Sequence, residues 1–148
     1  NSQIQVEILK KEAAAKGLTI REATVSTVND IQQAAHSLIG KIDALYIPTD
    51  NIMASAMPTL CKVSDEVKRP VICAEPGEVK AGGLITLGID YYMLGEETGA
   101  MAAEILNGKA KPQDMPIAFQ KEFTPSINKA QAEKLGLKIP EDIAKFAK

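Results

Sequence analysis

Short apolar runs alternate with longer segments of helical periodicity along the chain, and this alternation constrains the fold more than any other feature. The apolar runs at residues 44–47, 70–74 and 84–89 each stop at a polar or proline-containing turn, as buried strands do. Strands that alternate with helices and are joined by short turns predict a parallel sheet covered by helices on both faces. The sequence therefore predicts an α/β fold.

The remaining segments complete this pattern. Apolar residues recur at helical spacing through residues 4–15, 28–39, 52–67, 95–106 and 127–135, so we expect helices there. Pro58 is expected to kink the third of these helices or to restart it. Two further runs, residues 18–25 and 117–123, have the composition of strands.

Composition excludes several classes of protein. The 148 residues suit one domain, and a net charge of -2 argues against a nucleic-acid binder, which normally carries a basic stripe. No apolar run approaches the ~18–20 residues that span a bilayer. No leader of charged and then apolar residues opens the chain, so we expect any export signal to be absent from it or already removed.

Catalytic motifs are missing from the sequence. His36 is the only histidine and is expected to be a surface or half-buried helix residue. No G-x-S-x-G, H-E-x-x-H, C-x-x-C, phosphate loop or G-x-G-x-x-G occurs, and Cys61 and Cys73 are expected to be buried thiols. We therefore predict a protein that is not an enzyme and that needs no metal or cofactor.

Acidic residues follow three of the predicted strands. Asp50, Glu75 and Asp90 stand where these strands end, and ligands of such sheets bind beyond the carboxyl ends of the strands. Because neighbouring strand ends lie ~5 Å apart, the three acids can converge on one protonated amine. A ligand carboxylate would need free backbone N–H groups at a helix start, which residues 1–2 or 26–27 could supply.

Helix capping is the alternative explanation for these acids. Asp and Asn after a strand commonly cap the next helix, so Asp50 and Asn51 are open to either reading. Glu75 precedes Pro76, which makes capping a poorer explanation there, and Asp90 could equally be a turn residue.

Four segments resemble one known family: VSTVNDIQQAA (residues 25–35), IDALYIPTDN (42–51), LGIDYYMLG (87–95) and ILNGKAKP (105–112). They are similar to the substrate-binding proteins of ABC importers related to the tryptophan/tyrosine-binding lipoproteins. The resemblance implies a type I periplasmic-binding-protein architecture, in which two Rossmann-like α/β lobes hold a ligand between them. It implies no enzyme activity.

Such proteins are about twice as long, so the resemblance implies that the first lobe and the strand opening the second lobe are missing. Residues 1–94 would form the second, ligand-binding lobe, and residues 95–148 a return segment and C-terminal helices that pack on the absent lobe. The implied ligand wall is Asn1, Ser2, Asp50, Asn51, Glu75 and Asp90. Glu75 matches the position that holds an acid for the substrate ammonium in related branched-chain amino-acid receptors; Thr49 and Tyr91 are weaker candidates.

The missing strand would lie between residues 18–25 and 44–47. Unpaired strand edges are templates for further pairing and cost stability. We therefore expect these two strands to collapse together, to recruit residues 117–123, or to pair with another copy of the chain.

The function expected from the acids and the resemblance together is that of an extracytoplasmic, periplasmic or lipid-anchored solute receptor. It would bind a small solute, an amino acid and perhaps an aromatic one, and deliver it to ABC permease subunits. The ligand-sensing domain of a transcription regulator with the same fold is one alternative. An α/β enzyme half whose catalytic residues lie in the missing part is another.

Overall fold

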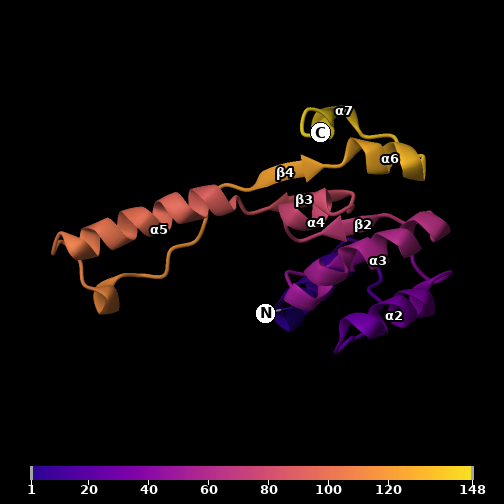
Figure 1. Ribbon diagram of the computed structural model, residues 1–148, viewed down its shortest axis with the longest axis horizontal. Helices are drawn as coiled ribbons and strands as arrows, with labels where there is room; N and C mark the ends of the chain where they lie inside the picture. Colours follow the sequence, from indigo (N-terminus) through magenta and orange to yellow (C-terminus); the bar gives the residue numbers. More distant parts are fainter. Residues whose placement is uncertain (1, 148) are drawn as a thin grey trace.

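Four short strands form one sheet in the spatial order β1-β2-β3-β4. The computed structural model describes residues 2–147 (Figure 1). The strands are β1 (Leu45–Ile47), β2 (Val71–Cys73), β3 (Ile85–Gly88) and β4 (Thr124–Ile127). The three predicted apolar runs are thus confirmed as neighbouring strands.

The sheet is parallel except at one edge. Ile47 pairs with Cys73 and Ile72 with Ile85 in parallel register, as predicted, whereas β4 runs antiparallel to β3. The strand expected at residues 117–123 does not form there, and its place is taken by Thr124–Ile127. The connection from β3 to β4 runs out along the helix at residues 91–106 and back through residues 107–123, and not as a crossover helix on the sheet; this return permits the antiparallel direction of β4.

The prediction of a strand at residues 18–25 is wrong. These residues have no strand assignment and most are exposed, although Val25 packs against the core. Within residues 2–147, β1 has β2 as its only strand neighbour and forms an edge of the sheet. A strand forms only when its backbone groups find a partner, and residues 18–25 neither pair with β1 nor receive residues 117–123.

The predicted helices are present. They are α1 (Ser2–Ala15), η1 (Val28–Asp30) continued by α2 (Ile31–Leu38), α3 (Asn51–Val67), α5 (Tyr91–Leu106) and α6 (Lys129–Leu135). Three short helices were not predicted: α4 (Pro76–Lys80), η2 (Pro112–Asp114) and α7 (Glu141–Ala144). The polar turn expected after Glu75 is therefore helical.

The helix α3 continues through Pro58 and does not restart there. Proline removes one helix hydrogen bond and crowds the preceding turn. Residues on both sides of it are anchored, because Met57 is fully buried and Leu60 is only 2% exposed. Packing against the sheet therefore holds the helix together across the proline.

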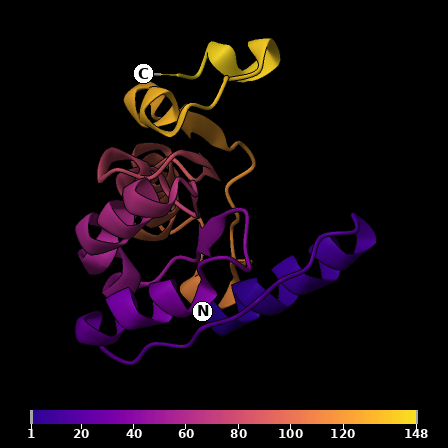
Figure 2. The same cartoon turned by 90° about the vertical axis from the view of Figure 1, so that its right-hand side faces the viewer.

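The core lies on one face of the sheet, between β1 and β2 and the helices α2, α3 and α4. Ile31, Met57 and Val71 are its largest fully buried apolar residues. The opposite face is less covered, since Tyr46 is 36% and Leu87 66% exposed. The helix α1, in indigo in Figure 2, extends away from the sheet with Ala13 as its buried residue.

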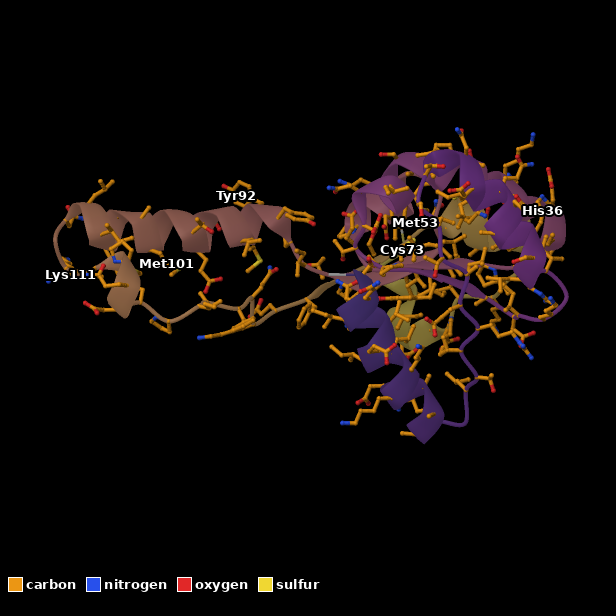
Figure 3. All side chains as sticks on the ribbon, turned by 90° about the horizontal axis from the view of Figure 1, so that it is seen from below. His36, Met53, Cys73, Tyr92, Met101 and Lys111 are labelled. Carbon is orange, nitrogen blue, oxygen red and sulfur yellow. The ribbon has the colours of Figure 1, made fainter. Side chains whose placement is uncertain are left out.

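Residues 91–123, here called the arm, leave the sheet after β3 and return to β4. Figures 1 and 3 show α5 projecting far from the sheet, with η2 and the returning chain beside it. No residue of α5 is buried, and Leu106, Ile117 and Phe119 are 86%, 82% and 77% exposed. The arm therefore presents large apolar side chains that residues 2–147 leave uncovered.

The chain after the arm packs on the sheet. β4 pairs with β3 along its length, and Gln131 of α6 donates from Nε2 to Oδ1 of Asp65 on α3 at 2.7 Å. Lys134 forms an ion pair with the same carboxylate. Residues 124–134 therefore pack beside β3 and α3 while the arm stands apart from the sheet, and packing of residues 95–148 on a first lobe stays a prediction.

Candidate functional site

Each of the three strand-end acids caps the helix that follows it. Asp50 Oδ1 accepts hydrogen bonds from the N–H groups of Ile52 (2.9 Å) and Met53 (3.3 Å). Asp90 Oδ1 does the same for Tyr92 (2.9 Å) and Met93 (3.3 Å). An extended residue at the end of a strand has the backbone conformation that an N-cap requires.

Glu75 also caps, contrary to the expectation that Pro76 makes capping a poor explanation. Its Oε2 accepts from Gly77 N at 2.8 Å and its Oε1 from Glu78 N at 2.9 Å. Pro76 does not interfere because it occupies the first helical position of α4, where no backbone N–H is needed. Both oxygens of Glu75 are thereby engaged.

The three caps nevertheless lie along one edge of the sheet. They follow β1, β2 and β3, which are neighbours in parallel register, so their strand ends lie ~4.8 Å apart. Capping uses a single oxygen of Asp50 and of Asp90. The second oxygen of Asp50 accepts from Ser2 Oγ at 3.2 Å, and the second oxygen of Asp90 has no protein hydrogen bond within residues 2–147. Two of the three acids therefore keep an acceptor that can face a cation.

The first turn of α1 meets this edge. Besides the contact between Ser2 and Asp50, the N–H of Thr49 donates to Gln5 Oε1 at 2.8 Å. Gln5 was missed by sequence reasoning, although it stands on the same helix three residues after Ser2. Asn1, the other predicted residue at this helix start, lies outside the described residues.

Gln120 is a second residue that sequence reasoning missed. Its Oε1 accepts from Asp90 N at 3.2 Å, and its Nε2 donates to Asp90 O at 3.3 Å. Gln120 lies on the return of the arm, 30 positions after Asp90, so no local pattern indicates the contact. Through it the outgoing and returning chains are tied together beside the acidic edge.

Glu78 is the third missed residue and the one with the most unusual surroundings. It is 1% exposed; its Oε2 accepts from Ala74 N at 3.1 Å, and its Oε1 has no partner among residues 2–147. Burial raises the pKa of this carboxyl to about 7, and the neighbouring acids Glu75 and Asp50 act in the same direction. The available signal was its position three residues after the cap Glu75, where capping boxes place an acid.

The remaining candidates lie as follows. Asn51 opens α3 and is exposed, while Tyr91 and Tyr92 begin the arm and are 56% and 76% exposed (Figure 3 labels Tyr92). Backbone N–H groups expected to be free at residues 26–27 are not, because Ser26 and Thr27 both donate to Asp30 Oδ2, at 3.3 and 2.9 Å. That expectation fails because Asp30 supplies the acceptor in a local cap.

The other titratable groups do not build a second site. Cys61 and Cys73 are buried, and burial raises the pKa of their thiols to about 11 and about 12, so both stay protonated. His36 is exposed on α2. Among residues 2–147 no cluster of three or more His, Cys, Asp or Glu side chains has a metal-binding arrangement, and no helix is long and apolar enough to cross a membrane.

Two grooves within residues 2–147 lie away from this edge. One is an open apolar depression along the outer face of α1, lined by Ile4 and Ile8. Another lies between α6 and α7, lined by Leu137 and Ile139 among others. Neither groove includes a strand-end acid.

Comparison with known proteins identifies the family. The profile of the ABC transporter substrate binding proteins matches residues 1–148, the whole chain. The chain belongs to this family. A curated relative, the tyrosine-binding protein of Clostridioides difficile strain R20291, is 40% identical over 149 residues, covering 100% of this chain and 43% of the relative.

Solved structures of substrate-binding family members share the fold. The ABC domain of Streptococcus pneumoniae in complex with L-Trp superposes with a TM-score of 0.89 at 37% identity, covering 99% of this chain and 50% of that one. The ligand-free, open structure of a Clostridium difficile substrate-binding protein with adhesive properties gives a TM-score of 0.77 at 43% identity, covering 96% and 48%. The chain therefore spans about half the length of these relatives, and its α/β lobe matches part of each.

Proposed function

We propose that this chain forms the greater part of one lobe of an extracytoplasmic receptor that binds an amino acid, with preference for an aromatic one, and delivers it to an ABC importer. The observation that carries the proposal is the row of Asp50, Glu75 and Asp90 at the ends of three neighbouring parallel strands. A protonated α-amine offers three donors and one positive charge, which suits such a row. The names of the relatives, tyrosine-binding and complexed with L-Trp, support the aromatic preference.

Each site residue has a distinct role in this proposal. The second oxygens of Asp50 and Asp90 accept from the ammonium group, that of Asp50 in addition to its hydrogen bond from Ser2 Oγ. Glu75 contributes its negative charge although both its oxygens cap α4. Ser2 and Asn51 complete the polar wall from the starts of α1 and α3. No bond of the ligand is broken in this scheme, so the chain acts by binding and not by catalysis.

The arm supports a two-lobed receptor. Leu106, Ile117 and Phe119 are largely exposed, and the relatives contain about as many residues again as this chain. We propose that these side chains pack against a first lobe, and that ligand contacts to both lobes favour a closed state which the permease recognises. The expected lobe boundary at residue 94 then falls in the first turn of α5, close to the start of the arm.

The proposal is tested by titrating the full-length protein with each of the twenty amino acids in a calorimeter. Asp50→Asn and Asp90→Asn retain a side chain that can cap a helix but lose the negative charge. We expect both to weaken binding by about tenfold or more, as loss of a charge-assisted hydrogen bond does, with little change in melting temperature.

Asp30→Asn is the matched control, because it makes the same chemical change at an exposed local cap away from the edge. Its affinity should equal that of the wild-type protein. The proposal would be contradicted if the wild-type protein bound none of the twenty amino acids. It would also be contradicted if Asp50→Asn, Asp90→Asn and Asp30→Asn bound the ligand with equal affinity.

A further inference from the structure

Glu78 lies beneath the acidic edge with an oxygen that no protein group satisfies. Its side chain is 1% exposed and its Oε1 has no partner within residues 2–147. Thr86 Oγ1, on the β3 surface that faces the core, is buried without a partner as well. An ionised carboxylate is costly to bury in this way unless a positive charge lies near it.

The same carboxyl group is hydrogen-bonded to the residue that follows β2. Its Oε2 accepts from Ala74 N at 3.1 Å, and that N–H also donates to Ile47 O at 3.0 Å. In a capping box the third helical residue bonds to the N–H of the cap, whereas here Glu78 reaches one residue further back. Glu78 thus joins α4 to the end of β2 immediately before Glu75, and shares the Ala74 N–H with the last carbonyl of β1.

The groups that face Glu78 make its surroundings acidic. β3 and β4 contain no titratable side chain, and Lys80 on α4 itself is exposed. The titratable groups whose charge couples to Glu78 or to its neighbouring thiol come from β1, α3, β2 and the cap of α4: Tyr46, Asp50, Cys61, Cys73 and Glu75. The thiols and the phenol are neutral near pH ~7, and the two carboxylates disfavour a further negative charge.

We propose that Glu78 couples ligand binding to the release of a proton: the ammonium group of an amino acid held at Asp50, Glu75 and Asp90 brings a positive charge beside this buried carboxyl, which then ionises. The O–H bond of the Glu78 carboxyl breaks, its electron pair stays on the carboxylate, and the proton passes to the solvent. The ligand keeps its own protons. The coupling rests on the proposed function, because it requires a cationic ligand at this edge.

The coupling makes affinity depend on pH. In the ligand-free protein the pKa of Glu78 is about 7, so below this pH the ligand has to displace a proton and above it does not. We expect the wild-type protein to bind up to about tenfold more tightly at about pH 8 than at about pH 6. Glu78→Gln has no proton to release at this position, so its affinity should stay nearly constant over the same range.

The experiment is calorimetry on the full-length protein with L-tyrosine and L-tryptophan as probes, at about pH 6.5, in two buffers of different ionisation enthalpy. The difference between the apparent binding enthalpies in the two buffers gives the number of protons released per ligand bound. Wild type should release a substantial fraction of one proton, and Glu78→Gln almost none. Glu66→Gln makes the same change at an exposed position on α3 and should behave like wild type.

The outcomes separate the two proposals. Binding of either probe with no proton release by wild type, or with equal release by Glu78→Gln, overturns the coupling and leaves the proposed function intact. Failure of wild type to bind either probe at any pH overturns the coupling, and failure with all twenty amino acids overturns the proposed function as well. If Glu78→Gln does not fold, Glu78→Met, which keeps a side chain of similar length, replaces it. Proton release by the wild type and none by Glu78→Met would then support the coupling, and equal release by both would overturn it.

Discussion

Replacing Glu78 by glutamine should stabilise the folded protein at neutral pH, even without any ligand. The pKa of Glu78 is raised from 4.5 to about 7, first because the side chain is buried and then because Glu75 and Asp50 lie near it. In the unfolded chain the carboxyl ionises near its ordinary value. Between these two pKa values the folded state holds a proton that the unfolded state has lost.

The sign and size of the effect follow from this difference. Below about pH 4.5 both states are protonated and Glu78 imposes no ionisation cost. As pH rises to about 7 the cost grows, and above that pH it is constant. At 1.36 kcal/mol per pKa unit, the upward shift of the Glu78 pKa lowers the free energy of unfolding at alkaline pH by at most about 3 kcal/mol. Glutamine avoids this cost and keeps an acceptor for Ala74 N.

The assay is denaturant unfolding of the full-length, ligand-free protein at several values between about pH 5 and about pH 8. The free energy of unfolding of Glu78→Gln minus that of wild type should be small at the acidic end and rise by up to about 3 kcal/mol at the alkaline end. Glu66→Gln, exposed on α3, should show no such rise. A difference that stays constant across this range, whatever its size, would refute the assignment of a raised pKa to Glu78.

Three further predictions concern packing, capping and the arm. Gly83→Ala should lower the free energy of unfolding by about 1–3 kcal/mol, because the added methyl overlaps Cys73 Sγ and lies 3.1 Å from Glu78 O. The control Gly99→Ala on α5 meets nothing within 4 Å and should be neutral or stabilising. Equal effects of the two variants in denaturant unfolding would contradict this prediction. Asp50→Ala should lower the free energy of unfolding by about 1 kcal/mol because the N-cap of α3 is lost, and Asp50→Asn should lower it much less. Thermal melting of the two variants measures the difference. Similar losses of stability would mean that the charge of Asp50, and not capping, stabilises α3. In hydrogen exchange of the full-length protein, the amides of α5 should be protected as strongly as those of α3, and rapid exchange throughout α5 would argue against a covering lobe.

The acidic edge was predictable from sequence because it depends on local order. Apolar runs that stop at Pro48, at Glu75 and after Ile89 indicate where the strands end, and parallel strands bring their carboxyl ends to one side. The same local reasoning was wrong about the capping role of Glu75. Proline after it suggested a residue unsuited to capping, yet proline is well tolerated at the first position of a helix.

Contacts between distant segments were not predictable in this way. Gln5 meets Thr49, and Gln120 holds both backbone groups of Asp90, across 44 and 30 positions of sequence. Nothing in the spacing of apolar residues specifies which glutamine side chain will find a backbone group. Such contacts depend on the path of the chain between elements, which only the folded molecule defines.

By itself, the sequence determined the class of fold, the positions of β1, β2 and β3, and the row of acids that follows them, because hydrophobic period and turn chemistry act within a few residues. Tertiary structure alone decided that residues 18–25 find no strand partner among residues 2–147, that β4 runs antiparallel, and that Glu78 is buried beneath the edge. The physical reason is that strand pairing and burial depend on partners from elsewhere in the chain. The ionisation of a carboxyl depends in turn on the solvent and charges which those partners leave around it.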